Sequence, residues 1–321
     1  MIPEISVLIT ARNAADTIVQ AVQSILDQTM WDFELLVYDD ASEDQTATLV
    51  ESMTDRRIRL IRGREHKGIP AARNILLREA RGAFIAWLDA DDWAFPQRLE
   101  RQLDYFRKHP QTEMLFSWIE VRNAGILAVR MPANGSLLTA WLMLRNPFAH
   151  STLMARNFFA AEGICYDESF ARAQDYELYL RLANEKVFSM LPEILVSYDA
   201  RSGAAEQLAL PFLPRLLKRN LQAAGIQAGP LEIEMFLHFL CSNSNPDISA
   251  CLTTSRILEL LENATWPVIA DRTWKKQVLL RQWFRLFRLS KGSTKWKAFK
   301  KIFLAGPLQW WSLWSWRVRW D

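Results

Sequence analysis

Three carboxylates stand within four residues, at Asp89, Asp91 and Asp92, directly after the apolar run AFIAWL. Like charges this close repel one another and raise each other's pKa, so a cation that neutralises them stabilises the cluster. Oxygen ligands of this type suit Mg²⁺ or Mn²⁺, and such an ion can bridge to phosphate oxygens. Taken alone, the same cluster is also compatible with a solvated acidic turn that caps a helix.

Polar residues follow apolar runs at two earlier points of the chain. Thr10 and Arg12 follow the run ISVLI, and Asp39 and Asp40 follow the run FELLVY. A further motif, GIPAARN, begins at Gly68 and lies between these positions and the acid cluster. The acid cluster is therefore not isolated, and its function depends on whether the fold brings these positions together.

The apolar runs before these positions are short and continuous, which is typical of strands buried on both faces. Strands are expected over residues 5–10, 33–38, 58–61 and 83–88. Helices are expected between them, over residues 17–28, from 42 onward and over 70–80. This alternation predicts an α/β domain with a mixed, mostly parallel sheet covered by helices on both faces. Ligands bind at the carboxyl ends of the strands in such sheets, so the polar residues mark the expected site.

The strand–helix alternation stops after about residue 95. A strongly periodic helix is expected over 175–184 and a strand over 194–198. Beyond residue 203 the pattern is helical throughout. The predicted organisation is a domain over 1–203, with halves 1–95 and 96–203, and a helical C-terminal region over 204–321.

Composition excludes several classes of protein. The chain has 321 residues, of which 50% are hydrophobic and 23% charged, so it can bury a large core and is not disordered as a whole. The net charge of +3 hides an asymmetry, because residues 271–321 hold 13 Lys and Arg against two acids. Eight of the 14 Trp lie in the same stretch. The sequence therefore predicts an acidic globular body with a basic, Trp-rich tail.

The tail over residues 291–321 begins with a Lys-rich segment and continues into the Trp-rich segment. Trp favours the headgroup zone of a bilayer, and Lys and Arg are attracted to anionic lipid. Together they predict an in-plane contact with an anionic membrane surface. The alternative is that these Trp pack on the body or at a dimer interface. A recognisable nucleic-acid module is missing, so no nucleic-acid partner is expected.

The cysteine content and the first residues of the sequence indicate a location in the cytoplasm. The three Cys are an odd number without metal-ligand spacing, as in a reducing compartment. The first residues lack the pattern of a signal peptide, and there is no apolar run of 18 residues. The expected location is cytoplasmic, peripheral on the inner face of the cytoplasmic membrane.

Four ordered motifs together carry a resemblance to a known family. They are SVLITARNAADTIVQAVQSILDQT, ELLVYDDASEDQT, GIPAARNILLREARGAFIAWLDADD and AQDYELYLRL. They resemble the nucleotide-sugar-binding half of the family 2 glycosyltransferases, over about residues 4–200. The resemblance implies the GT-A fold and a nucleotide-sugar donor.

The resemblance implies roles for residues on the donor side. Thr10, Arg12 and Asp40 match positions that hold the nucleotide base and ribose, and a carboxylate can accept the ring N–H of uracil or thymine. The family often has an aromatic residue where Arg12 stands, and a guanidinium can also stack on a base. Arg73 matches a residue near the diphosphate, where a bidentate cation fits. Its alternative is an exposed charge on a helix.

The acid cluster resembles the DxD motif of the family. Asp89 matches a donor-binding position, and Asp91 or Asp92 matches the metal ligand, which implies Mn²⁺ or Mg²⁺ as cofactor. Many relatives also carry a His after the last sheet strand, but this chain has none there. Asp199 or Arg201 could take its place.

On the acceptor side, Asp175 matches the catalytic base of the family, which takes a proton from the attacking hydroxyl. Gln174 stands where relatives usually have Glu. His150 lies in a segment that resembles the acceptor-side wall, although a lone His is as often a structural residue. One displacement inverts the anomeric carbon.

The resulting prediction is an inverting, metal-dependent glycosyltransferase that uses a UDP- or dTDP-linked sugar. Its acceptor would be a hydroxyl of a cell-envelope glycan or lipid-linked saccharide. The alternatives are a non-catalytic, membrane-associated scaffold of the same fold and a sugar nucleotidyltransferase. The latter would need a Gly-rich, basic loop after the first strand, and this chain lacks one.

Overall fold

The computed structural model describes residues 2–122, 146–183, 185–199, 211–241 and 248–264, together with residues 138, 141, 142, 144, 278, 279, 282, 286, 294, 295, 297 and 298. The chain divides into two compact units. The first comprises Met1–Gly135 and Phe148–Leu208, and the second comprises Ser136–Pro147 and Ala209–Asp321. The division expected from the sequence falls after residue 203, with residues 136–147 in the first domain.

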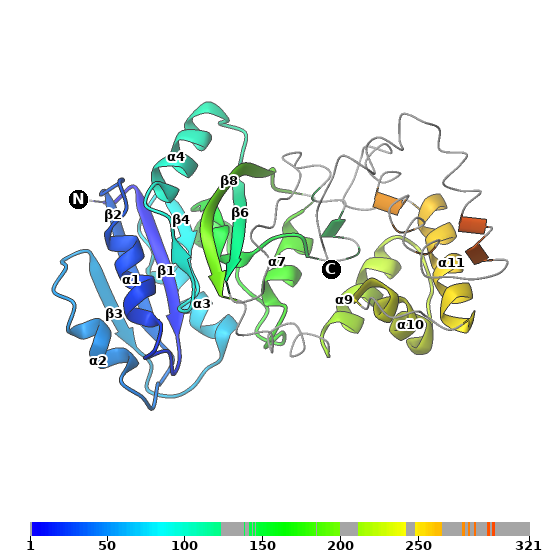
Figure 1. The fold of residues 1–321 in the computed structure, drawn as a ribbon, viewed down its shortest axis with the longest axis horizontal. Coiled ribbons are helices and arrows are strands. Elements are labelled where there is room, and N and C mark those ends of the chain that lie inside the picture. Colours follow the sequence, from blue (N-terminus) through cyan, green and yellow to red (C-terminus); the bar gives the residue numbers. More distant parts are fainter. Residues whose placement is uncertain are drawn as a thin grey trace. The chain divides into compact units, whose positions relative to one another are not determined.

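The first unit is built on one sheet, in which the described strands have the order β3-β2-β1-β4-β7-β6-β8-β5 (Figure 1). The strands are β1 (Ile5–Ala11), β2 (Phe33–Asp39), β3 (Ile58–Arg62), β4 (Phe84–Trp87), β5 (Trp93–Ala94), β6 (Met114–Arg122), β7 (Met154–Arg156) and β8 (Phe188–Asp199). β1, β2, β3 and β4 pair in parallel, as do β6 and β8. β7 is antiparallel to both of its neighbours, and β5 is antiparallel to β8.

Helices cover both faces of this sheet. The crossovers through α1 (Ile18–Leu26) and α2 (Thr46–Glu51) run in one direction along the sheet, and the crossover through α3 (Ile69–Glu79) runs back. Because such crossovers are right-handed, α1 and α2 lie on one face and α3 on the other. The predicted fold class, a mixed and mostly parallel sheet with helices on both faces, is confirmed. The remaining elements of this unit are α4 (Arg98–Lys108), η1 (His150–Thr152), α6 (Phe159–Glu162) and α7 (Gln174–Leu182).

The chain order creates a switch point between β1 and β4. These two strands are neighbours, yet the chain visits β2 and β3 before it returns to β4. The two crossovers therefore leave on opposite faces, and a crevice opens at the carboxyl ends of the strands. Residues that follow β1, β2 and β4 are placed around this crevice.

Apolar residues of the central strands explain why the sheet forms here. Every residue from Ile5 to Ile9 is fully buried, and so is the stretch from Leu35 to Val37. Fully burying an aliphatic side chain of this kind contributes roughly 1.5–3 kcal/mol. α1 adds its own buried face, with Ile18, Val22 and Ile25 at helical spacing.

The helix expected from Ser42 onward begins later, at Thr46. The side chains of Ser42 and Asp44 accept hydrogen bonds from the backbone N–H groups of Asn13 and Ala15, at 2.9 and 3.0 Å. These bonds hold residues 42–45 as a loop against the end of β1. Polar side chains that were expected in a first helical turn thus make tertiary contacts, and Asp44 in addition accepts the backbone N–H of Thr46 at 2.9 Å, at the start of α2.

Two other expectations need correction. The strand expected over 194–198 is part of the longer β8, which begins at Phe188 and pairs with β6. β5 and β7 were not expected, because two or three residues are too short to show a strand period.

The second unit contains α9 (Leu213–Ala223), α10 (Pro230–Cys241) and α11 (Ile248–Asn263). Its core includes Phe236, Phe239 and Leu258. Within the predicted tail, Ala298 is buried in this core, and Lys297 pairs with Glu259 at 2.8 Å. Most other tail residues lie outside the described residues. Among the described helices, none combines the length and the apolar character needed to cross a bilayer.

Candidate active site

The loop after β2 places a buried carboxylate at the carboxyl edge of the sheet. Asp40 accepts hydrogen bonds from the backbone N–H groups of Lys67 and Gly68, at 2.8 and 2.9 Å, and from Nδ1 of His66 at 2.8 Å. Gly68 has φ of +87°, a conformation that favours glycine and turns the chain into α3. Asp40 therefore fixes residues 66–68 at the entrance of α3.

Thr10 and Arg12 lie beside this loop, at the end of β1. Thr10 is half-buried and is the register partner of Tyr38 in β2. Arg12 is exposed, and its guanidinium lies 3.6 Å from the carboxylate of Glu43. The backbone N–H of Asp40 donates to the carbonyl of Ala11 at 2.8 Å, so the ends of β1 and β2 are joined directly.

Arg73 lies in α3 and is buried, with only 4% of its surface exposed. It is therefore not an exposed charge on a helix, which was the alternative role for this residue. Its Nη2 donates to Oδ1 of Asp89 at 2.9 Å, and its guanidinium lies over the rings of Trp87 and Tyr166, 5.6 Å from each centroid. Burial alone would lower the pKa of Arg73, but the interaction with Asp89 and the smaller ones with Tyr166, Asp175 and Tyr179 together outweigh it, so the pKa is raised. Its Nε and Nη1 have no hydrogen-bond partner among the described residues. Two buried nitrogens, which carry three N–H donors, thus lack a protein acceptor among the described residues, as in a site that binds an anion.

The three carboxylates of the acid cluster face different surroundings. Asp89 is half-buried beside Arg73, and Asp92 is buried and accepts from the backbone N–H of Asp199 at 2.8 Å and from the hydroxyl of Ser151. Asp91, which stands between Asp89 and Asp92 in the sequence, is half-buried. Burial, the charge of Asp89 and the charge of Asp199 raise the pKa of Asp91 to about 6. In the part of the chain that the structure describes, three metal-ligating side chains do not converge on one point.

Asp92 does not belong to a solvated acidic turn, which was the alternative interpretation of the acid cluster. It is 1% exposed, and burial together with the charge of Asp89 raises its pKa well above the ordinary value. Both of its oxygens accept protein donors, which tie the end of β4 to η1 and to β8. The fully buried Arg98 supports the same strand end by donating to the carbonyl of Trp87 at 2.8 Å.

Asp175 and Gln174 form the first turn of α7. Burial raises the pKa of Asp175, and the charge of Asp89 adds to this rise, whereas Arg73 lowers it. Gln174 is buried, and its Oε1 has no hydrogen-bond partner among the described residues. The helix is held by an ion pair between Glu177, which is buried, and Arg181 at 3.1 Å. A carboxylate with a raised pKa thus lies within electrostatic reach of Arg73 and Asp89.

His150 is enclosed by aromatic hydroxyls. Its Nδ1 lies 2.8 Å from the hydroxyl of Tyr179, and its Nε2 lies 3.4 Å from the hydroxyl of Tyr166. Burial, and then the charges of Arg73 and Arg98, hold its pKa well below the ordinary value for His. A neutral His whose two nitrogens both contact Tyr hydroxyls is what a structural residue would show, and this was the alternative named for His150.

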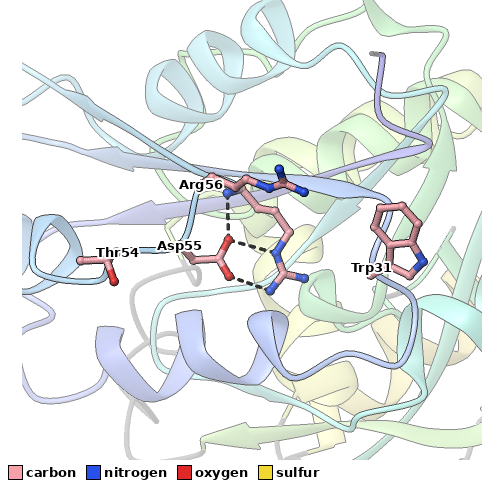
Figure 2. A pocket seen from close by; sticks show the side chains of 5 residues that line it. Trp31, Thr54, Asp55 and Arg56 are labelled. Atoms are coloured by element: carbon pink, nitrogen blue, oxygen red, sulfur yellow. Dashed lines mark hydrogen bonds and ion pairs between the residues drawn. The ribbon is translucent and has the colours of Figure 1, made fainter.

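A hollow of about 480 Å³ lies at the opposite edge of the sheet, and Figure 2 shows its lining residues. They are Trp31, Thr54, Asp55, Arg56 and Arg57, which precede β2 and β3. These residues stand at the amino ends of the strands. None of the predicted site residues lines this hollow.

The sequence profile described as Glycosyl transferase family 2 matches residues 6–187. The chain belongs to this family. The family 2 profile spans the sheet of the first unit up to the start of β8. This assignment establishes the chain as a glycosyltransferase.

Two relatives show the range of similarity. An uncharacterized glycosyltransferase of Methanocaldococcus jannaschii is 30% identical over 205 residues, which cover 61% of this chain and 70% of that protein. The Escherichia coli protein WfgD, a UDP-Glc:alpha-D-GlcNAc-diphosphoundecaprenol beta-1,3-glucosyltransferase, is 37% identical over 123 residues. That match covers 38% of this chain and 49% of WfgD, so the chain spans about half the length of this relative.

Two solved structures share the fold. S. aureus TarS in complex with UDP-GlcNAc superimposes with a TM-score of 0.57 at 16% identity, over 93% of this chain and 89% of that one. The mannosyltransferase PcManGT of Pyrobaculum calidifontis, in complex with GDP-Man and Mn²⁺, gives a TM-score of 0.56 at 16% identity, over 94% and 85%. The predicted GT-A fold is confirmed.

The structure adds residues that the sequence analysis had passed over. His66 was assigned no role, although it lies two residues before the GIPAARN motif and contacts Asp40. Ser151 and Tyr166 contact the acid cluster and Arg73. Their positions depend on strand pairing across the sheet, and sequence spacing carried no signal for them.

Proposed function

We propose that this glycosyltransferase moves a sugar from a UDP- or dTDP-linked donor to a hydroxyl of a cell-envelope glycan or lipid-linked saccharide, with inversion. The observation that carries the proposal is the buried Arg73. Two of its nitrogens have no partner among the described residues, and it pairs with Asp89 and lies within electrostatic reach of Asp175. A buried cation with free donors can bind the diphosphate leaving group. A carboxylate on the other side of the sugar can then act as the base.

The nucleoside end of the donor would lie at the carboxyl ends of β1 and β2. Thr10 and Arg12 would contact the base and ribose, and Asp40 holds the loop that borders them. Arg12 is exposed and paired only at 3.6 Å, so a nucleotide can displace Glu43 from it. An exposed ion pair of this kind contributes at most about 1 kcal/mol.

Whether the residues present fit a divalent cation follows from the chemistry of their donor atoms. Asp91 is a half-buried carboxylate whose pKa is raised to about 6 by burial, Asp89 and Asp199. A hard divalent cation fits such a donor, because it relieves the repulsion and takes its remaining ligands from water and diphosphate. Asp91 would hold Mn²⁺ or Mg²⁺, with Asp199 in the place of the late His. Asp92 would position the loop, because protein donors occupy both of its oxygens.

Bound there, the metal would neutralise negative charge on the diphosphate. Arg73 would hold the same diphosphate and stabilise it as the bond to the anomeric carbon breaks.

The base in this reaction would be Asp175. The acceptor hydroxyl oxygen bonds to the anomeric carbon, its proton passes to the carboxylate of Asp175, and the diphosphate leaves with the electrons of the broken bond. The raised pKa of Asp175 suits proton transfer near neutral pH. Gln174 would orient the acceptor through its unpartnered Oε1, and His150 would support the wall behind it.

The acceptor class is supported by WfgD, whose name gives a diphosphoundecaprenol-linked sugar as its acceptor. A lipid-linked acceptor requires access to a membrane surface. The tail over 291–321 would provide it by contact with anionic lipid on the cytoplasmic face. No nucleic-acid partner is part of this proposal.

The proposal is tested by a thermal-shift panel of nucleoside diphosphates and nucleotide sugars, each with Mn²⁺, Mg²⁺ or EDTA. Binding to the native state raises the melting temperature by mass action. We expect a metal-dependent rise with a uridine or thymidine diphosphate sugar, followed by slow release of free sugar. The variant Asp91→Asn should lose the metal dependence, and Asp104→Asn, a half-buried carboxylate of α4 that pairs with Arg107, serves as the control. Folded protein that responds to no nucleotide would favour the scaffold alternative.

A further inference from the structure

His66 makes a contact that its neighbours in the sequence do not explain. Its Nδ1 lies 2.8 Å from Oδ2 of Asp40, and the other acceptor positions of that carboxylate are used by the backbone N–H groups of Lys67 and Gly68. A carboxylate has about four lone-pair positions, and three of them are filled by these contacts. Asp40 is therefore mainly a clamp on residues 66–68.

This clamp fixes the hydrogen-bonding character of the imidazole. A carboxylate that accepts two backbone N–H groups can only accept from the ring as well, so Nδ1 carries the hydrogen. In the neutral ring the other nitrogen, Nε2, is then an acceptor. The pair presents a fixed acceptor at the end of β2.

The free edge of the ring faces outward. The side chain of His66 is 49% exposed, whereas that of Asp40 is only 5% exposed. Since Nδ1 lies against the buried carboxylate, the exposed half of the ring includes Nε2. Among the described residues, His66 makes no second side-chain hydrogen bond that would occupy it.

Two nearby elements of the sequence carry charged side chains with partners of their own. Lys67 pairs with Glu65 at 2.7 Å, and Arg12, at the end of β1, lies 3.6 Å from Glu43. His66 is a group on this loop with a defined direction and an open hydrogen-bonding position among the described residues. Asp40 joins it to the end of β1 through the hydrogen bond from its backbone N–H to Ala11.

We propose that His66, oriented by Asp40, reads the nucleotide base by accepting a ring N–H at Nε2. Uracil and thymine carry this hydrogen on N3 and guanine carries it on N1, whereas cytosine and adenine have an unprotonated acceptor nitrogen there. The site should therefore favour uridine, thymidine and guanosine diphosphates over cytidine and adenosine diphosphates. This inference rests on the proposed function, because it requires the donor nucleotide to bind at the ends of β1 and β2.

The test measures dissociation constants for UDP, GDP, CDP and ADP by titration calorimetry with Mg²⁺ present. A single hydrogen bond of this kind corresponds to roughly tenfold in affinity. The wild-type protein should bind UDP or GDP at least about tenfold more tightly than CDP. His66→Ala should reduce that ratio by about tenfold, mainly through weaker binding of the favoured nucleotide.

Two further variants separate the hydrogen bond from other effects. His66→Phe keeps an aromatic ring but lacks an acceptor, so discrimination should be lost here too, whereas a stacking role would preserve it. His109→Ala removes a His that stacks on Tyr105 in another part of the sheet domain and should leave every affinity unchanged.

The outcomes are distinguishable. If folded wild-type protein binds no nucleotide, the proposed function fails and this inference fails with it. If nucleotides bind but the ratio of UDP to CDP affinity survives in His66→Ala and His66→Phe, only the inference fails. Loss of the ratio in both variants, with intact binding in His109→Ala, would support it.

Discussion

The charged side chains at the two ends of the parallel strands differ in how completely they are paired. At the amino ends of β2 and β3, Asp55 and Arg57 form a bidentate pair at 2.8 and 3.0 Å, and this hydrogen bonding lowers the pKa of Asp55 (Figure 2). At the carboxyl ends, the pKa of Asp91 is raised to about 6 and Arg73 keeps two buried nitrogens without a partner among the described residues. The ion pair at the amino ends is complete, whereas at the carboxyl ends protein donors satisfy Asp92 but the hydrogen bonding of Arg73 is incomplete.

This difference bears on which end of the sheet is the better candidate for a site. The amino-end hollow has a volume of about 480 Å³, but the ion pair between Asp55 and Arg57 in its lining is already complete. The carboxyl end combines perturbed carboxylates with an unsatisfied cation, which is the pattern expected of catalytic groups. Charge that lacks a partner is the better indicator here, and each prediction below tests one side of the comparison.

The largest effect is expected for Asp175→Asn. The amide cannot take the proton of the acceptor hydroxyl, so the rate of transfer should fall by about 10²–10⁴. The affinity for the nucleotide should change by less than twofold, since the proposed donor site lies on the Arg73 side. Initial rates and nucleotide titrations check both parts, and a variant with ordinary turnover would remove Asp175 from the role of base.

The same carboxylate should shape the dependence of the rate on pH. Burial raises the pKa of Asp175 above the ordinary value of about 4, and the base must be deprotonated to act. The rate should therefore decline as pH falls through this raised pKa, at a higher pH than an exposed Asp would give. An acid limb at or below about pH 4 in kcat against pH, with donor saturating, would contradict the assignment.

Arg73→Ala should have the next largest effect. It removes the buried donors for the diphosphate and leaves Asp89 without its ion pair. Losing one such charge-stabilising group costs about 10²–10³ in rate. Measurement of kcat/KM tests this, with circular dichroism to confirm folding, and Arg78→Ala in the last turn of the same helix is the matched control.

Much of the fold followed from the sequence because continuous apolar runs and helical periods are local signals. β1, β2 and β3 begin where the pattern places them, and the acid cluster follows β4 as expected. The start of α2 did not follow, because Ser42 binds the loop after β1, and Asp44 binds both that loop and the backbone N–H of Thr46, where the helix begins. A single sequence does not reveal which of two partners a polar side chain will choose.

The ordered motifs name Arg73, Asp89 and Asp175 as candidates for the site, and the structure brings the charges of these three residues within reach of one another. Their contacts were less predictable. The inward turn of Asp92 depends on Ser151 and Asp199, which come from distant segments. The role of His66 likewise depends on a loop conformation set by the positive φ of Gly68.

At the amino ends, Asp55→Asn should affect stability rather than activity. It weakens a half-buried bidentate pair with Arg57, at an expected cost of roughly 1–2 kcal/mol in the free energy of unfolding. The pKa of Asp55 is lowered in the folded state, so its contribution is present above about pH 4 and is lost as pH falls through the folded value. Urea denaturation at pH 7 and at pH 3 checks this, and the difference between variant and wild type should shrink at pH 3. Any change in nucleotide affinity would break the comparison between the two ends.

The smallest effect is expected for Trp31→Ala. Trp31 is 69% exposed and lines the amino-end hollow, so its removal should change the free energy of unfolding by no more than about 0.5 kcal/mol. Transfer and donor binding should also stay the same, because the hollow lies across the length of β2 from Asp40. A selective loss of acceptor binding in initial-rate measurements would instead give this end a ligand of its own. It would also show that a region whose ionic contacts are complete can still bind through an exposed aromatic side chain, so unsatisfied charge would no longer suffice to locate every site on this fold.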